Sequence, residues 1–370
     1  MLDGPQITLA MHIPDNFVSP STGGLFWLVM IPVWTLCLRA VMREATPEKM
    51  AYLGAGAAFS FLVMMFNVPT PGGTTAHGVG GALIAMLLGP QYATIAVSVA
   101  LLLQALLFGD GGLITLGVNC FNMGVVLPFA AYGVAVLLRG LPARGVPGGA
   151  RDDAAGGWRE RAAQFAGGYV GLTLAALCVA LELGVQPLLF RAADGQALYF
   201  PFALNVTVPA MLVPHLLVAS VVEGLVTVAA VGFVRRSAPE LVAGGTPASA
   251  SESVSVSAST ASHRGGLRWS AWVALGVAAL LSPIGLLATG DAWGEWGAED
   301  FMGATGLDYV PRYIADGFTW NALLPDYSLT GLPDAAGYVL SAVIGVAILT
   351  IAFRLLAAAL PRRSRGAGAR

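Results

Sequence analysis

Met11-His12-Ile13-Pro14-Asp15 is a short polar stretch that stands directly before the first long apolar run of the chain, at about 24–41. Runs of this kind recur from there to about residue 360. About 20 consecutive apolar residues, wound as a helix, are enough to cross the hydrocarbon core of a bilayer. The runs therefore predict an all-α polytopic membrane protein, with the polar stretch leading into its first helix.

The composition agrees with a membrane protein and argues against other classes. Of the 370 residues, 56% are hydrophobic and 11% are charged, whereas a soluble domain is about 25% charged. The formal net charge is −2 and no basic stripe is present, which argues against nucleic acid as a partner. Cys37, Cys120 and Cys178 lie inside apolar runs without CxxC spacing, so we interpret them as small core residues.

The positions of the basic residues predict which way the chain crosses the membrane. Arg39, Arg43 and Lys49 follow the first run, and further basic clusters follow the runs that end near 138, 234 and 360. Cytoplasmic loops collect Lys and Arg, so the N-terminus is predicted outside and the C-terminus in the cytoplasm. We expect about nine transmembrane helices, as a seven-helix bundle plus two C-terminal helices. One of these runs, at about 79–88, is too short to span the bilayer unless it is extended or tilted.

Changes in composition divide the chain into five segments. Residues 1–10 are an N-terminal extension ahead of the polar stretch, and residues 11–236 form the first membrane domain. Residues 237–268 are rich in Ser and Ala with no large apolar face, which predicts a flexible cytoplasmic linker. Residues 269–361 hold two further helices joined by an acidic outer loop, and residues 362–370 are a basic tail. We expect most carboxylates of the acidic loop to be solvated.

Two histidines are the best candidates for binding chemistry. The chain contains only 4 histidines, and the predicted topology puts His12 and His77 on the same, outer side. Their imidazoles, the His12 amide nitrogen and a free amine at Met11 would supply four nitrogen donors. That set suits square-planar Ni(II) or Cu(II) and allows Co(II). The amine donor exists only if the chain starts at Met11. The alternative is that both histidines are polar residues of the outer surface.

Several polar side chains lie within the apolar runs, where they need partners. His215 and Glu223 share one run, and we weigh a polar contact between helices equally with a role in conduction or coupling. Glu182 stands near the outer end of its run, where we expect it to extend to the membrane interface. Asn119 and Asn122 could support a metal-binding histidine or bond two helices, and the second interpretation is favoured for Asn122.

Motifs of ATPases and hydrolases are missing from the sequence. Lys49 is the only lysine, so the chain cannot contain a Walker A loop, which ends in Gly-Lys-Ser/Thr. Any ATP hydrolysis that the protein uses must therefore come from another polypeptide. There is no HExxH motif, and no GxSxG stands at a strand–helix junction. An intramembrane hydrolase therefore has no support.

The motifs together resemble the CbiM/NikM family, the substrate-binding membrane subunits of nickel and cobalt energy-coupling-factor (ECF) transporters. The likeness extends over about residues 11–236 and is carried by Met11-His12-Ile13-Pro14-Asp15 with Phe17, the segments 72–82, 88–90, 104–113 and 117–123, and His215 with 223–227. The part after the linker resembles the NikN/PDGLE-like companion subunit of these systems, fused to the same chain. That second likeness is carried by the segments 282–286, 291–296 and 325–328.

The resemblance implies where the metal is held. Its ligands would be the amine and amide nitrogens at Met11-His12, the imidazole of His12, and His77, with the N-terminal segment tucked into the bundle. The residues that we expect to support these ligands or to couple binding to transport are Asp15, Thr75, Asn119, His215 and Glu223. Asn16 stands where the family commonly has glycine, which affects the turn after Asp15.

The expected function is that of the substrate-binding component of an ECF-type ABC importer, which takes up Ni(II) or Co(II) across the cytoplasmic membrane. The metal is the transported substrate, and no organic cofactor is expected. The expected partners are a transmembrane coupling (T) subunit, separate ATP-binding subunits and the lipid bilayer. The alternatives are a secondary metal transporter without an ATPase, and a membrane metalloenzyme. The second alternative is disfavoured because no general base or nucleophile stands beside the histidines.

Overall fold

The computed structural model describes residues 12–70, 74–140, 157–237, 264–287, 296–299 and 301–359. Met11, the N-terminal extension 1–10, most of the linker 237–268 and the basic tail 362–370 lie outside the described residues.

Helices account for most of the described chain, with one short β-hairpin. The first half contains α1 (Pro20–Arg43), α2 (Pro47–Met64), β1 (Val68–Thr70), β2 (Thr74–Ala76), α3 (Gly81–Leu88), α4 (Pro90–Leu103), η1 (Gln104–Phe108), α5 (Leu116–Phe121), η2 (Asn122–Val126) and α6 (Leu127–Gly140). The centre contains α8 (Trp158–Gly184), α9 (Gln186–Leu189), α10 (Leu204–Pro214), η3 (His215–Ala219) and α11 (Ser220–Ser237). The C-terminal part contains α13 (Arg264–Leu281), η4 (Ser282–Leu287), α14 (Phe301–Thr305), α15 (Arg312–Asp316), η5 (Pro325–Tyr327) and α16 (Asp334–Ala359).

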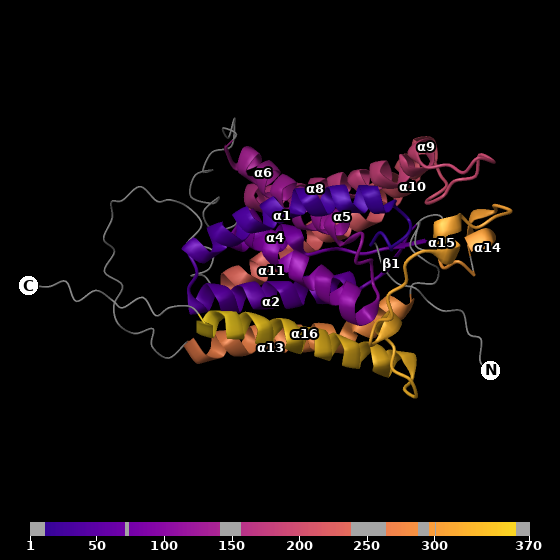
Figure 1. Cartoon of the computed structure of the whole chain (residues 1–370). Coiled ribbons are helices and arrows are strands. Elements are labelled where there is room, and N and C mark those ends of the chain that lie inside the picture. Colours follow the sequence, from indigo (N-terminus) through magenta and orange to yellow (C-terminus); the bar gives the residue numbers. More distant parts are fainter. Residues whose placement is uncertain are drawn as a thin grey trace, which may run out of the picture.

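The long helices run side by side in one bundle (Figure 1). The hairpin and the short helices α9, α14 and α15 gather at one end of it, which is also the end where α1 and α16 begin. At the lower edge of the view, α13 and α16 lie along α2, so the C-terminal part packs directly on the first bundle. This packing is close, because a Cβ added to Gly54 of α2 would lie 2.9 Å from the Cβ of Phe353 on α16.

The helix starts follow local sequence signals. The Ser19 hydroxyl accepts a hydrogen bond from the Thr22 N–H at 3.1 Å, and Pro20 occupies the first turn of α1. The Thr46 hydroxyl caps α2 in the same way, through the Lys49 N–H at 3.1 Å. A hydroxyl cap followed by proline is a preferred helix start, because both satisfy or remove otherwise unpaired N–H groups.

The helical membrane fold is confirmed. Six of the described helices are long and apolar enough to cross a membrane, and a helix covers each of the nine apolar runs that we identified. However, α3 has only 8 residues, which rise about 12 Å and so fall well short of a hydrocarbon core of about 30 Å. The count of nine spans and the direction of crossing therefore remain predictions.

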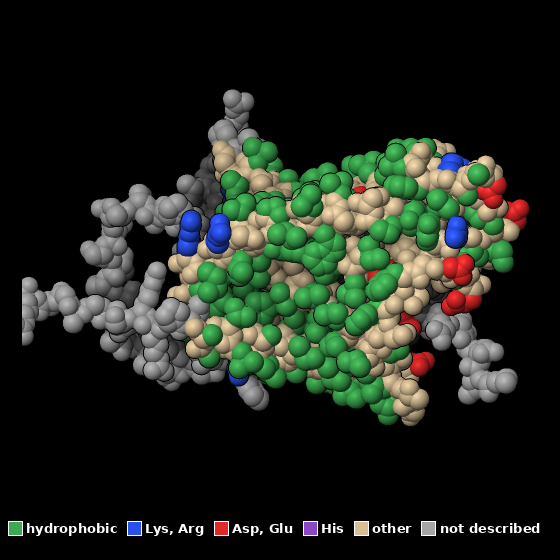
Figure 2. Space-filling view, viewed as in Figure 1, with side chains coloured by type: hydrophobic (Ala, Val, Ile, Leu, Met, Phe, Trp, Pro, Cys, Tyr) green, Lys and Arg blue, Asp and Glu red, His purple; other side chains and the backbone are tan. Residues whose placement is uncertain are grey.

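The surface is divided in the way that a bilayer would require. Hydrophobic side chains cover the middle of the visible face, and Asp and Glu side chains gather at the end that carries the loops and short helices (Figure 2). Asp308, Asp316 and Asp326 of the C-terminal outer loop are exposed, as expected for solvated carboxylates. Inside the bundle, Cys37 and Cys120 are buried core residues, whereas Cys178 is only half-buried.

Candidate metal site

The structure brings His12 and His77 together at the end of the bundle where the loops gather. The ring centroids are 5.3 Å apart and the ring planes differ by 34°. Both side chains are buried, with exposed fractions of 2% and 0%. The alternative of two polar residues on the outer surface is therefore wrong: the imidazoles face each other inside the protein.

A carboxylate fixes the orientation of the His12 ring. Nδ1 of His12 lies 2.6 Å from Oδ1 of Asp110. Because an ionised carboxylate can only accept, Nδ1 is the donor of this bond, and Nε2 is the nitrogen left for another partner. Nε2 is buried and has no hydrogen-bond partner among the described residues. A histidine that binds a metal through one nitrogen commonly donates the other N–H to a carboxylate, so this arrangement suits a ligand.

Asp110 was not among the residues predicted for the site. It lies in the glycine-rich stretch 109–112, and nothing in the sequence pattern linked it to His12, which is 98 residues away. The glycines around it are needed for the turn. Gly111 has φ +79°, and a Cβ there would lie 3.0 Å from the Cβ of His12. The signal that could have indicated Asp110 is an acidic residue between glycines, at the same predicted end of the helices as His12.

His77 is held in the neutral form. Its Nδ1 lies 2.8 Å from the carbonyl oxygen of Gly78, to which it can donate. Burial lowers the pKa of His77 to about 3, and the neighbouring His12 adds to that shift. Neutral imidazole is the form that binds a metal. His77 therefore needs no deprotonation before it can act as a ligand at neutral pH.

Two predicted supporting residues hold the N-terminal segment in the bundle. Asn119 exchanges two hydrogen bonds with the main chain of Ile13, at 2.9 and 3.1 Å, and Thr115 donates to the same carbonyl at 2.7 Å. Asp15 accepts from the N–H groups of Leu113, Ile114 and Thr115 at 2.8–3.1 Å, just before α5. These bonds hold Ile13 and Asp15 against the start of α5, and so place the neighbouring His12 beside it.

Asn16, the departure from the family pattern, fits its position. Its φ is +73°, a left-handed conformation that glycine adopts freely and asparagine tolerates better than most residues. The side chain also forms two hydrogen bonds with the main chain of Phe318, at 2.7 and 2.9 Å. The asparagine therefore preserves the turn and ties it to the C-terminal part.

The loop that carries His77 is held by side chains of α11 and α2. Oε2 of Glu223 on α11 accepts from the N–H groups of Val79 and Gly80, at 2.9 and 3.1 Å, and the Ser60 hydroxyl donates to the Val79 carbonyl at 2.7 Å. Thr75 lies in the hairpin, opposite Pro69, and its buried hydroxyl has no partner among the described residues. Glu223 thus makes a polar contact that positions the histidine loop.

The remaining polar residues are also buried in the bundle. His215 is buried at the start of η3, with Nδ1 2.6 Å from the carbonyl oxygen of Met211. Asn122 donates to Oε2 of Glu182 at 2.6 Å, so the predicted contact between helices is confirmed for Asn122. The expectation that Glu182 extends to the membrane interface is wrong. Its exposed fraction is 8%, because the amide of Asn122 gives the carboxylate a partner inside the protein.

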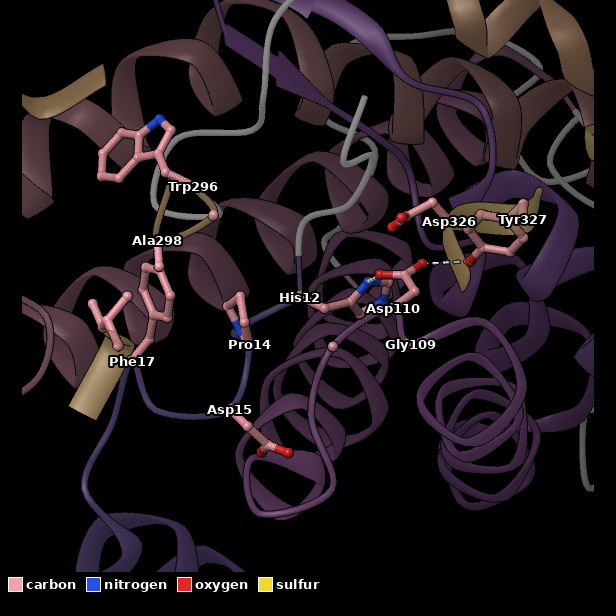
Figure 3. A pocket seen from close by; sticks show the side chains of 13 residues that line it. His12, Pro14, Asp15, Phe17, Gly109, Asp110, Trp296, Ala298, Asp326 and Tyr327 are labelled. Carbon is pink, nitrogen blue, oxygen red and sulfur yellow. Dashed lines mark hydrogen bonds and ion pairs between the residues drawn. The ribbon is translucent and has the colours of Figure 1, made fainter. Parts of the chain in front are cut away.

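A cavity of about 240 Å³ opens beside His12. Figure 3 shows its lining, to which the first domain contributes His12, Asp15 and Asp110 and the C-terminal part contributes Asp326 and Tyr327. Both parts of the chain therefore line the cavity beside His12.

The described side chains alone do not complete a metal site. Among the residues that the structure describes, no group of three or more His, Cys, Asp or Glu side chains could hold a metal ion. Two imidazoles, one backed by a carboxylate, are present, so any further donors would have to come from groups other than these side chains. Met11, the predicted source of the amine, lies outside the described residues.

Two known families match the chain in adjoining segments. CbiM, described as the cobalt uptake substrate-specific transmembrane region, matches residues 12–241. The PDGLE domain matches residues 268–362.

Similar proteins match along most of their length. The "Probable fused nickel transport protein LarMN" of Lactiplantibacillus plantarum is 41% identical over 351 residues, which covers 93% of this chain and 97% of that protein. The "Fused nickel transport protein NikMN" of Rhodobacter capsulatus is 42% identical over 371 residues, covering 96% and 100%. A crystal structure of a truncated transition metal transporter is 42% identical with a TM-score of 0.54, and the match covers 61% of this chain and 99% of that one. From the extent of these matches, the chain belongs to the CbiM family of cobalt-uptake transmembrane proteins and carries a C-terminal PDGLE domain.

Proposed function

We propose that this protein is the substrate-binding membrane component of an ECF-type importer that takes up Ni(II) or Co(II) across the cytoplasmic membrane. The observation that carries the proposal is the buried pair of His12 and His77, with Asp110 behind His12. The metal is bound by the two imidazoles together with the amine and amide nitrogens of Met11-His12. Nitrogen donors of this kind suit Ni(II) and also accept Co(II).

Nickel is the favoured cargo. The relatives from Lactiplantibacillus plantarum and Rhodobacter capsulatus are both named as nickel transport proteins. A planar set of four nitrogen donors also favours Ni(II). Cobalt remains in the proposal because the family description names cobalt uptake.

Each segment of the chain has its own role in this proposal. Residues 11–236 bind the metal, residues 237–268 are a cytoplasmic linker, and residues 269–361 are the fused companion. The N-terminus faces outside, where the metal is captured, and the C-terminus faces the cytoplasm. Because the only lysine is Lys49, the chain lacks a Walker A loop. Separate ATP-binding subunits and a transmembrane coupling subunit drive release of the metal to the inside. Asp15, Thr75, Asn119, His215 and Glu223 position the ligands or couple binding to transport.

Calorimetric titration of the purified protein with Ni(II) and Co(II) tests the proposal. The preparation must start at Met11, which intact mass verifies. We expect tight binding of at least one metal. His77→Ala should lose more than the roughly 10- to 100-fold that removal of a partner behind a ligand costs, since an imidazole ligand itself is removed. His263, which lies outside the described residues, serves as the control histidine, and His263→Ala should bind like wild type. A protein that binds neither metal, or one that His77→Ala leaves unchanged, would overturn the proposal.

The importer mechanism has its own test. Proteoliposomes that contain this chain, the coupling subunit and the ATP-binding subunits should accumulate Ni(II) added outside only when ATP is enclosed in the lumen, on the side of the ATP-binding subunits. Uptake by the chain alone, without ATP, would instead support a secondary transporter.

A further inference from the structure

The outer loop of the PDGLE domain is bonded to the helix end that carries the metal-site carboxylate. The Leu324 N–H donates to the carbonyl of Leu107 at 2.8 Å, and the Trp320 indole N–H donates to the carbonyl of Leu106 at 3.0 Å. Leu106 and Leu107 belong to η1, which ends immediately before Gly109 and Asp110. The loop is therefore placed next to Asp110 by main-chain contacts as well as by side chains.

Tyr327 is the residue of this loop that reaches the site. Its ring is buried and stacks on Phe108, with centroids 4.6 Å apart and planes 19° apart. Its hydroxyl donates to Oδ2 of Asp110 (Figure 3). Gln104 adds to this group, because its side-chain amide donates to the Tyr327 oxygen at 2.8 Å and to Asp110 Oδ2 at 3.1 Å.

The two oxygens of Asp110 are thus used for different purposes. Oδ2 receives hydrogen bonds from Tyr327 and Gln104, while Oδ1 lies 2.6 Å from His12 Nδ1. A carboxylate that is held at one oxygen cannot rotate freely at the other. The hydrogen bonds on Oδ2 therefore fix where Oδ1 stands, and Oδ1 fixes the His12 ring.

Packing alone does not account for a tyrosine at this position. The ring lies among Phe61, Phe108 and Tyr338, where phenylalanine would fill the same space. A buried hydroxyl is unfavourable unless it is hydrogen-bonded, and this one is bonded to the group behind His12. The hydroxyl therefore has a use that the aromatic cluster does not require.

We propose that Tyr327 is a positioning residue of the metal site, through which the PDGLE domain sets the metal affinity of the CbiM domain. The hydrogen-bond series runs from Tyr327, with Gln104, to Asp110 and then to His12. It holds the His12 ring in one orientation, with Nδ1 on Asp110 and Nε2 on the side away from that bond. The inference rests on the proposed function, because it assigns a partner to the same site.

The test compares Tyr327→Phe with Tyr338→Phe in the protein that starts at Met11 and keeps its PDGLE domain, using competition between the protein and a chromophoric chelator for Ni(II). Tyr338 is a matched control, since it is buried in the same cluster, 5.4 Å from the Tyr327 ring centroid, and its hydroxyl donates to the Met65 carbonyl at 2.9 Å. Loss of a hydrogen-bond partner behind a ligand costs about 10- to 100-fold in metal affinity. We expect about tenfold weaker binding for Tyr327→Phe and no more than about a twofold change for Tyr338→Phe.

Two further measurements separate positioning from general packing. Gln104→Met removes the other donor to Oδ2 and should weaken binding in the same direction. In an Asp110→Asn background, Tyr327→Phe should have little further effect, since it acts through that carboxylate. The visible absorption band of bound Cu(II) should shift in Tyr327→Phe but not in Tyr338→Phe, because only the first changes the donor geometry.

The possible results are distinguishable. Wild-type affinity in Tyr327→Phe, or equal losses in both tyrosine variants, would overturn the positioning role and leave the proposed function standing. The positioning role would also be overturned if Tyr327→Phe weakened Ni(II) binding as much in the Asp110→Asn background as it does in the wild type. A wild-type protein that binds no metal overturns the proposed function, and the positioning role with it.

Discussion

Asp110→Asn is the change that examines the support of His12 most closely. The side chain keeps its shape, but one carboxylate oxygen becomes an NH₂ group and the charge is lost. If the remaining oxygen faces His12, the NH₂ group meets the NH₂ group of Gln104, and the Tyr327 hydroxyl must turn from donor to acceptor. If the amide is reversed, the NH₂ group meets Nδ1–H of His12. Either orientation sets donor against donor in a buried place, where the Asp110 residue has an exposed fraction of 8%.

The magnitude follows from the bond that is lost. A hydrogen bond to a charged group contributes about 1.5–3 kcal/mol, and its loss behind a metal-binding histidine corresponds to about 10- to 100-fold in affinity. We therefore expect Asp110→Asn to weaken Ni(II) binding by about 1.4–2.8 kcal/mol, at 1.4 kcal/mol for each factor of ten.

Competition titration with a chromophoric chelator measures this loss, and Asp326→Asn is its control. Asp326 lines the same cavity and is exposed, so its replacement removes a nearby charge but leaves the His12–Asp110 bond in place. We expect Asp326→Asn to change affinity by less than about threefold, because exposed charges interact weakly. Equal losses in the two variants would show that the field of the cavity matters rather than the hydrogen bond. Unchanged affinity in Asp110→Asn would refute the reasoning outright.

Three further changes test how the site is built. Asp15→Ala removes the acceptor for the N–H groups ahead of α5; it should lower stability by about 1 kcal/mol in thermal unfolding and weaken Ni(II) binding, and intact binding would contradict its role in holding the segment. Gly111→Ala should cost about 1–2 kcal/mol in left-handed strain and also weaken Ni(II) binding, because its Cβ would lie 3.0 Å from that of His12. Gly195→Ala is the control: Gly195 has φ +89° with open space around it, so the substitution should cause similar strain without weakening Ni(II) binding. Gly171→Ala should lower the melting temperature, since its Cβ would lie 2.6 Å from a main-chain oxygen of α6; an unchanged value would show that the helices can move apart.

The sequence predicted those features that depend on local pattern. Apolar runs located the helices, because a run of about 20 apolar residues is typical of a membrane-spanning helix and of few other structures. The scarcity of histidine and the predicted topology singled out His12 and His77, and the structure places them 5.3 Å apart. The contact of Asn122 was also anticipated, since a buried amide must find a partner.

The features that sequence reasoning missed depend on contacts between distant residues. Asp110 stands 98 residues from His12, and Tyr327 stands 217 residues from Asp110. No periodicity indicates which outer turn meets which loop, so neither bond could be derived from a single sequence. Glu182 was misplaced for the same reason, because its partner Asn122 lies on another helix.

The central claim is that imidazole nitrogens of His12 and His77 hold the metal together. X-ray absorption spectroscopy of the Ni(II)-loaded protein that starts at Met11 tests this claim most directly, because imidazole rings give a characteristic outer-shell scattering. We predict scattering from two imidazoles in the wild type and from one in His77→Ala. A spectrum without imidazole scattering, or one that His77→Ala leaves unchanged, would contradict the claim.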